Sequence, residues 1–140
     1  MVSRGITLLE VLVVLVLVGI ITALALPGYR HQMIRVHRTE AMIALFDLQS
    51  AEEKFFMRHN RYTSEISAAP PSGLGLSTAS SSNKYEVSIA VALDGQSFIA
   101  TATPTPEGGQ AADRECSALS LDARGRRAAS GTRDARYCWK

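Results

Sequence analysis

The sequence is poor in aromatic residues and in cysteine, and both shortages limit what it can build. Tryptophan occurs once, phenylalanine four times and cysteine twice in 140 residues. Beyond its N-terminal segment the chain is rich in serine, alanine, threonine and glycine. Such a domain buries only a modest core, and small domains often need a covalent cross-link. The length fits one small domain together with an anchor, and no long internal repeat is present.

Catalytic and metal-binding patterns are also missing. The sequence has no nucleophile–base constellation and no glycine loop that would hold a phosphate. His31 and His37 do not share a helix face as a zinc pair four residues apart would. The net charge of +2, from 15 basic and 13 acidic residues, is too small to indicate a nucleic-acid binder by itself. We therefore assign no catalytic residue, no metal and no cofactor, and we expect a protein that is not an enzyme.

The chain does have one long apolar run, from Ile6 to Leu26, which Pro27 ends. At about 1.5 Å per residue, a helix of this run spans roughly 31 Å, the thickness of the hydrocarbon core of a bilayer. A cleaved secretory signal is the alternative, because residues 23–25 form an A-x-A cleavage pattern. Against that, the run is long for a signal and carries a carboxylate, Glu10, near its start. The run predicts a transmembrane helix over residues 6–28.

The start of the run resembles the type IV prepilin signature, in which a short polar leader ends in glycine before an apolar residue and T-L-[IL]-E. Here the motif is Gly5-Ile6-Thr7-Leu8-Leu9-Glu10, with Ile6 where the family usually has phenylalanine. The resemblance implies that a prepilin peptidase removes residues 1–5 by cutting between Gly5 and Ile6, and that Ile6 is then N-methylated. It also implies that Glu10 pairs with the terminal amine of a neighbouring subunit during assembly. A carboxylate that serves only the helix N-terminus and the lipid headgroups is the alternative.

Basic residues follow the run at residues 30, 31, 35, 37 and 38. Charge counting would place this C-terminal flank in the cytoplasm, whereas the signature and the two cysteines indicate a periplasmic domain. We interpret the basic residues as a collar that faces solvent or headgroups. Contact with acidic groups of neighbouring subunits is the alternative.

Helical periodicity resumes directly after Pro27, so we expect one helix from about Ile6 to Met57 with a kink or soft spot at Gly19 and Pro27. One face carries the apolar residues Ile34, Ala41, Leu45, Leu48 and Phe55, and Glu52 lies on the same face. This amphipathic second half predicts packing against a globular domain of residues 29–140.

After a Pro/Gly/Ser-rich loop at 59–84, the chain reads as an antiparallel sheet over residues 85–129. Strict alternation predicts a first strand at 85–93, and Asp94-Gly95 predicts a hairpin that returns at 96–103. A wide turn follows at 104–110, and two short strands are expected at 116–121 and 126–129. The sequence therefore predicts an α+β fold, with a long helix packed on about four antiparallel strands.

Cys116 and Cys138 lie near the C-terminus. A structural zinc would need four ligands, which the neighbouring sequence does not supply, so a disulfide in an oxidising compartment and a pair of free thiols remain. The spacing resembles the C-terminal disulfide loop of pilins, which favours a Cys116–Cys138 bridge around the loop 116–138.

A basic group lies in and beside that loop: Arg124, Arg126, Arg127, Arg133 and Arg136. We interpret it as a solvated face, with salt bridges to neighbouring subunits as the alternative. DNA capture is a further alternative, because basic clusters attract phosphate. No aromatic residues interleave with these arginines as a stacking platform would require, so nucleic acid is not the expected partner.

Together these features identify a type IV pilin-like structural subunit. We expect a minor pilin needed for pilus assembly, surface attachment and twitching motility. The expected partners are other pilin subunits, the prepilin peptidase, the inner-membrane assembly platform, and lipid before assembly. We expect a single-pass inner-membrane protein that later becomes part of an extracellular pilus. A type II secretion pseudopilin, a family that commonly lacks the C-terminal disulfide, and a DNA-uptake pilin are the alternatives.

Overall fold

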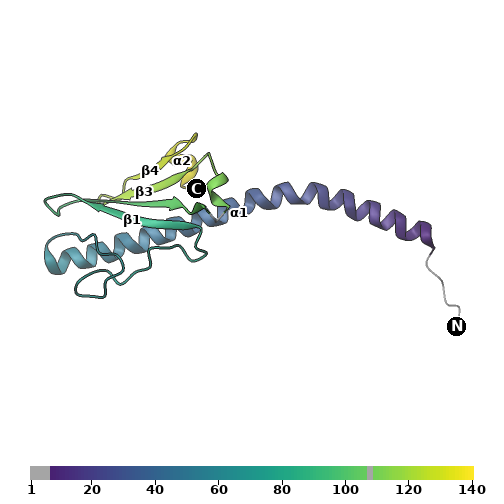
Figure 1. The fold of residues 1–140 in the computed structure, drawn as a ribbon. Coiled ribbons are helices and arrows are strands. Elements are labelled where there is room, and N and C mark those ends of the chain that lie inside the picture. The colour runs from purple at the N-terminus through teal and green to yellow at the C-terminus, as the bar shows by residue number, and fades with distance from the viewer. Residues whose placement is uncertain (1–6, 107–108) are drawn as a thin grey trace. The chain divides into compact units, whose positions relative to one another are not determined.

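The computed structural model describes residues 7–106 and 109–140, except for the side chains of residues 25–28 and 30. Its elements in chain order are α1 (Leu8–His59), β1 (Tyr85–Val91), β2 (Phe98–Pro104), η2 (Gln110–Ala112), β3 (Ala118–Asp122), β4 (Arg127–Ser130) and α2 (Ala135–Cys138). The residues divide into two compact units, one that ends at Met33 and one from Ile34 to Lys140. The predicted α+β class is confirmed, because a long helix precedes four antiparallel strands in the order β1-β2-β3-β4 (Figure 1).

The first unit is the apolar part of α1. Thr7 precedes the helix, and its hydroxyl accepts a hydrogen bond from the backbone N–H of Glu10 at 3.2 Å, as a helix N-cap does. The helix continues through Pro27, as predicted. Measured by length and hydropathy together, none of the helices in the described part of the chain qualifies as a membrane span. The transmembrane half of α1 and its kink at Gly19 and Pro27 stay predictions.

The second half of α1 packs on the sheet along the predicted face. Ala41, Leu45 and Leu48 are buried there against a cluster formed by the inner faces of three strands. The strands contribute Tyr85, Val87, Phe98, Ala100, Ala102, Leu119 and Leu121. Each fully buried leucine or phenylalanine contributes about 1.5–3 kcal/mol, so this face of the helix holds the globular unit together.

The strands lie close to their predicted positions but begin later or end earlier. β1 stops at Val91 because the hairpin turn is wider than two residues, and the backbone N–H of Ala92 donates to the Ser97 carbonyl at 2.9 Å. Gly95 adopts a positive φ of 68° in this turn, which glycine tolerates without strain. β3 begins at Ala118 rather than Cys116, since the N–H of Cys116 is bound to the Asp113 carboxylate. Leu93, predicted to lie in the first strand, is instead fully exposed at the turn.

The chain between α1 and β1 is irregular, as predicted. Asn60, with a φ of 56°, ends the helix in the left-handed conformation typical of a C-terminal cap. The hairpin turn is attached to this point, because the N–H of Tyr62 donates to the Gly95 carbonyl at 2.9 Å and the Gln96 side chain donates to the Asn60 carbonyl. An isolated bridge between Ala79 and Glu86 brings the end of the loop to the edge of β1.

The predicted disulfide is confirmed. Cys116 and Cys138 are bonded with 5.6 Å between their Cα atoms, and both are fully buried. The bridge joins the start of β3 to α2, a short helix that the sequence analysis did not predict. Asp134 caps α2 by accepting a hydrogen bond from the N–H of Tyr137 at 3.0 Å.

Removal of the bridge should destabilise the globular unit. We expect Cys116→Ser to lower the free energy of unfolding of a chain that starts at residue 29 by about 2–5 kcal/mol, the usual cost of losing a native disulfide. Guanidinium denaturation measures the change, with the exposed loop variant Thr132→Ser as the control that should remain unchanged. Two reactive thiols in native protein isolated from an oxidising compartment would contradict the bridge.

Candidate functional site

A buried ion pair attaches the C-terminal disulfide region to α1. The Arg38 guanidinium makes two hydrogen bonds of 2.6 Å to the carboxylate oxygens of Asp113, and both side chains are almost fully buried. The hydrogen bonds to Asp113 raise the pKa of Arg38. The same carboxylate accepts the N–H of Cys116 at 3.2 Å. The interpretation of Arg38 as part of a solvated collar is therefore wrong, because this arginine faces the core and holds a loop.

Gln110, also buried, completes this network. Its side-chain amide lies within hydrogen-bond distance of three acceptors: the Tyr85 hydroxyl at 3.0 Å, the Asp113 carboxylate and the Ile34 carbonyl, both at 3.3 Å. Burial raises the pKa of Tyr85 to about 12, so its hydroxyl stays protonated. Each buried polar group of the network therefore has a partner, as a low-dielectric site requires.

The arginines that the sequence singled out lie on the surface around this anchored loop. Arg126 pairs with Asp122 at 2.6 Å, and Arg133 lies 3.4 Å from a carboxylate oxygen of Glu115. Arg124 and Arg136 are exposed, and neither has an ion pair among the described residues. The cluster therefore presents fewer free charges than its arginine count suggests.

Aromatic rings do lie beside these arginines, which corrects the sequence interpretation. The Arg127 guanidinium lies over two rings, 5.2 Å from the centroid of Phe46 and 5.3 Å from that of Trp139. Arg133 lies 4.9 Å over Tyr137. The sequence could not show the contact with Phe46, which comes from α1. Trp139 is nearly buried and its indole N–H donates to the Ala128 carbonyl, so this ring is already in use and does not offer a free stacking face.

The N-terminal site residues are described only in part. Gly5 and Ile6, the predicted cleavage and methylation positions, lie outside the described residues. Glu10 lies exposed in the first turn of α1, where a carboxylate favours the helix dipole. Gly19 lies within α1, and a Cβ there would meet nothing within 4 Å. The structure thus leaves both interpretations of Glu10 open.

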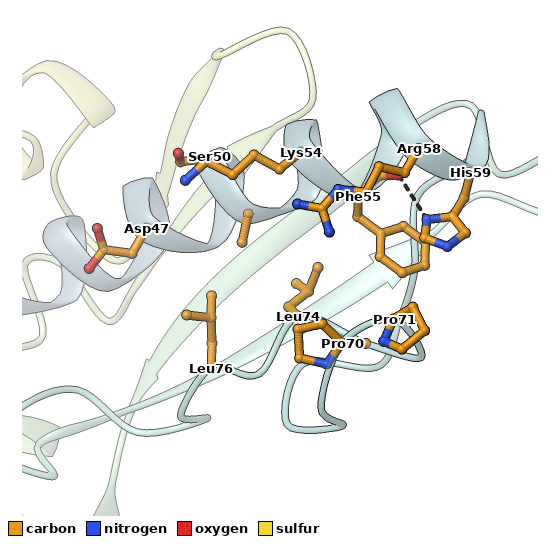
Figure 2. Close-up of a pocket in the computed structure, with 12 residues that line it drawn as sticks. Asp47, Ser50, Lys54, Phe55, Arg58, His59, Pro70, Pro71, Leu74 and Leu76 are labelled. Atoms are coloured by element: carbon orange, nitrogen blue, oxygen red, sulfur yellow. Dashed lines mark hydrogen bonds between the residues drawn. The ribbon is translucent and has the colours of Figure 1, made fainter.

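A groove that the sequence analysis missed lies between α1 and the loop at residues 70–76 (Figure 2). Its volume is about 330 Å³. The floor is largely apolar, and cationic side chains of α1 stand along one wall. The lining residues are Asp47, Ser50, Ala51, Lys54, Phe55, Arg58, His59, Pro70, Pro71, Gly73, Leu74 and Leu76. His59 stacks on Phe55, with ring centroids 4.1 Å apart, which closes one end.

Comparison with known proteins identifies the family. Residues 27–120 match the model of the family described as "Type IV minor pilin ComP, DNA uptake sequence receptor". The chain belongs to this family of type IV pilins.

Individual relatives agree with this assignment. The pilin is 33% identical over 76 residues to the type IV major pilin protein PilE1 of Neisseria gonorrhoeae, which covers 51% of the pilin and 46% of PilE1. It is 34% identical over 62 residues to the type II secretion system core protein G of Pectobacterium carotovorum, covering 44% and 40% of the two chains. The matches therefore span less than half of each relative's own length.

Among solved structures, the pilin is similar to a type IV pilin from Shewanella oneidensis. The TM-score is 0.49 and the identity 26%, over 67% of the pilin and 89% of that chain. The predicted family is confirmed by the family match over residues 27–120, and as a member of this family the pilin is a structural subunit.

The family match includes the anchor of the C-terminal loop but not the arginines. Arg38, Asp113 and Cys116 lie within residues 27–120, whereas the arginine cluster begins at Arg124. The N-terminal motif with Glu10 lies before the match. The match therefore shows what kind of subunit this is and leaves both of these candidate sites to be argued from their own residues.

One buried carboxylate of the pilin lacks a full set of partners. Glu52 of α1 is fully buried, its Oε2 accepts the N–H of Thr63 at 3.2 Å, and its Oε1 has no hydrogen-bond partner among the described residues. The adjacent Glu53 accepts the hydroxyl of Tyr62 at 3.0 Å. Two successive carboxylates thus hold the first residues of the loop after α1.

Burial raises the pKa of Glu52 from its ordinary value near 4.5 to about 7. Because the folded protein binds this proton more tightly than the unfolded chain, stability from this group falls as the pH rises from about 4.5 to about 7 and stays low above that.

Replacement of Glu52 by glutamine should therefore remove a pH dependence. We expect Glu52→Gln to be less sensitive to pH between 5 and 8 than the wild type, and to be relatively more stable at pH 8. Thermal unfolding across this range measures the difference, with the exposed strand variant Glu86→Gln as the control that keeps the wild-type slope. Parallel pH profiles for wild type and Glu52→Gln would contradict the assignment.

Proposed function

We propose that this pilin is a minor subunit of a type IV pilus, which contributes to filament assembly, surface attachment and twitching motility. The observation that carries the proposal is the exposed first half of α1. Apolar side chains there point outward on all sides: Leu8, Leu9, Leu12, Leu15, Leu17, Ile20, Ile21 and Leu24 are each more than half exposed. An exposed apolar surface of this size marks an interaction site.

We propose that the corresponding helices of neighbouring subunits pack against this apolar surface in the filament. Burying one leucine, valine or isoleucine contributes about 1.5–3 kcal/mol, so a helix with apolar residues on every face gains most in the centre of a bundle. Lipid covers the same surface before assembly, when the pilin resides in the inner membrane with its globular unit in the periplasm. A prepilin peptidase cuts between Gly5 and Ile6 and Ile6 is methylated, which creates a new terminal amine four residues before Glu10 in the sequence.

Glu10 then acts during assembly as the partner of a neighbour's terminal amine. It is the acidic residue of the first turn of α1 and lies among exposed leucines and valines. When such a helix is buried, a charge needs a partner, because an unpaired carboxylate in an apolar environment costs several kcal/mol.

The variant Glu10→Leu separates assembly from anchoring. We expect normal leader cleavage and normal or higher levels in the membrane, together with loss from filaments. Removing one partner of a buried charge pair costs about 3–5 kcal/mol, roughly a hundredfold or more in an incorporation equilibrium. Immunoblots of membrane and sheared-filament fractions measure both levels. Wild-type levels of Glu10→Leu in filaments would sink the assembly role.

A secretion pseudopilin remains the nearest rival, since the pilin is 34% identical over 62 residues to protein G of a type II secretion system. The Cys116–Cys138 bridge supports the pilus assignment, because pseudopilins commonly lack it. Neighbouring genes for pilus assembly, rather than for secretion, are the observation that decides between the two.

DNA capture is the second candidate function. The matched family is described as a DNA uptake sequence receptor, and the C-terminal surface has exposed arginines. Arg124, Arg127 and Arg136 have no ion pair in the described part of the chain, and Arg127 lies over the Phe46 and Trp139 rings, which leaves Arg124 and Arg136. Such free guanidinium groups are available for phosphate contacts, which give affinity that falls with salt.

Alanine substitution of the free arginines tests this second function. We expect Arg124→Ala and Arg136→Ala to weaken duplex DNA binding by the globular unit and to lower its salt slope by about 0.9 for each phosphate that is no longer neutralised. Arg126→Ala is the matched control, because Arg126 is already paired with Asp122. Fluorescence anisotropy over a salt series measures both quantities. If the wild-type protein shows no salt-dependent DNA binding, the second function is contradicted, and the filament proposal is unaffected.

A further inference from the structure

The groove between α1 and the loop at residues 70–76 has a charge that nothing within the described chain neutralises. Lys54 and Arg58 are exposed on its α1 wall, and neither forms an ion pair among the described residues. The floor beneath them is apolar, formed by Phe55, Leu74 and Leu76. Figure 2 shows Phe55 and Arg58 of α1 on the side of the helix that faces the prolines and leucines of the loop, whereas the Lys54 side chain runs along the helix. A suitable occupant therefore has an apolar side chain next to a negative charge.

The chain itself carries such a pair at the tip of the β1–β2 hairpin. Leu93 has a relative exposure of 110%, the highest of the large apolar side chains described, and Asp94 follows it. The tip is held in place, because Asp94 Oδ1 accepts the N–H of Gln96 at 2.9 Å and the Gly95 carbonyl accepts the N–H of Tyr62. A fixed tip loses little conformational entropy on binding.

We infer that the Leu93–Asp94 tip of one copy of this pilin binds in the α1 groove of a second copy. Leu93 packs on the apolar floor, and Asp94 pairs with Lys54 and Arg58 on the wall. The groove, at about 330 Å³, is ample for one leucine side chain, since a cavity of about 150 Å³ holds a benzene molecule.

The remaining charges near the two surfaces are also complementary. Arg61 lies beside the tip: its Cβ is 3.1 Å from the position that a Cβ on Gly95 would occupy. Asp47, at the far end of the groove, provides a carboxylate for this arginine. The contact thus joins one anion and one cation of the tip to the opposite charges of the groove, which is the pattern that favours a specific orientation.

Other exposed apolar side chains of the globular unit fit the groove less well. Met57, 77% exposed, adjoins Arg58 and would bring a cation towards the cationic wall. Ile99, 54% exposed, lies within the flat outer face of β2 rather than at a projecting turn. Of the large apolar side chains described in the globular unit that are more than half exposed, Leu93 is the one that a carboxylate follows directly in the sequence.

This inference goes beyond the proposed function, because it requires two copies to be adjacent rather than dispersed singly along a filament. The tip and the groove are different surfaces, so reciprocal binding gives a closed pair and one-way binding gives an open chain. In both arrangements the residue at position 93 of one copy lies against the α1 wall of the other.

Disulfide trapping between two differently tagged full-length chains in detergent tests the contact. One chain carries Leu93→Cys and the other Ser50→Cys, an almost isosteric change at an exposed position of the groove. We expect a cross-linked heterodimer after mild oxidation, visible on a non-reducing gel, at several times the yield of the control. The control pairs Leu93→Cys with Met57→Cys, which is exposed on the same helix but outside the groove. Equal yields from the two pairs would overturn the inference.

Removal of the paired charges within the same trap provides a second test. Asp94→Asn in the tip, which keeps the oxygen that accepts the Gln96 N–H, and Arg58→Gln in the groove should each lower the cross-linking yield. Their combination should lower the yield no further than Asp94→Asn alone. Both side chains are exposed, so unchanged unfolding temperatures of the variants exclude misfolding as the cause. A combination whose loss is the product of the two single losses would contradict the pairing. Because the readout uses isolated chains, it is independent of whether the pilin enters a filament.

Discussion

The position of the C-terminal half of this pilin depends on a single buried ion pair. Arg38 of α1 binds the Asp113 carboxylate through two hydrogen bonds, from Nε and Nη2, and Asp113 in turn accepts the backbone N–H of Cys116. Burying two charges is costly, and their attraction offsets that cost only if every remaining polar group has a partner. Gln110 and Tyr85 provide those partners. The main effect of the Arg38–Asp113 pair is therefore to fix the position of the disulfide loop on α1, and its net contribution to the stability of the fold is small.

Helix α1 has a second buried charge of a different kind. Glu52 lies on the same core-facing side as Leu45 and Leu48, yet one of its oxygens lacks a partner in the described structure. The carboxylate remains because it holds the N–H of Thr63, directly after the helix ends. The buried carboxylate lowers the stability of the fold above neutral pH, but it fixes the start of the long loop. The hairpin tip contacts the same loop start through Tyr62, so the groove and the tip are both positioned from the end of α1.

Local sequence patterns were sufficient to predict the helices and strands, but they could not predict contacts between residues far apart in the sequence. The period-two alternation predicted β1, and the helical periodicity after Pro27 correctly predicted that α1 continues through this proline. Each of these signals is contained within a short stretch of sequence. Nothing near Arg38 in the sequence indicates that its partner is Asp113, 75 residues away. Phe46 likewise meets Arg127 only through the packing of α1 beside β4. One signal was present and was missed: Asp134 is an N-cap residue before a short helix. Glu52 was placed on the apolar face of the helix, but its burial as a carboxylate was not inferred.

The distribution of charge explains how a chain of net charge +2 can present two distinct basic surfaces. At physiological ionic strength the screening length is about 8 Å, so a partner senses the local groups and not the total. In the C-terminal region Asp122 and Glu115 already bind Arg126 and Arg133. Those exposed pairs contribute little to stability, but they restrict the free positive charge to a few positions. In the α1 groove Lys54 and Arg58 have no such partners among the described residues, and an apolar floor lies beneath them. The first surface suits a solvated polyanion, whereas the second suits a carboxylate delivered next to an aliphatic side chain, so the two surfaces select chemically different partners.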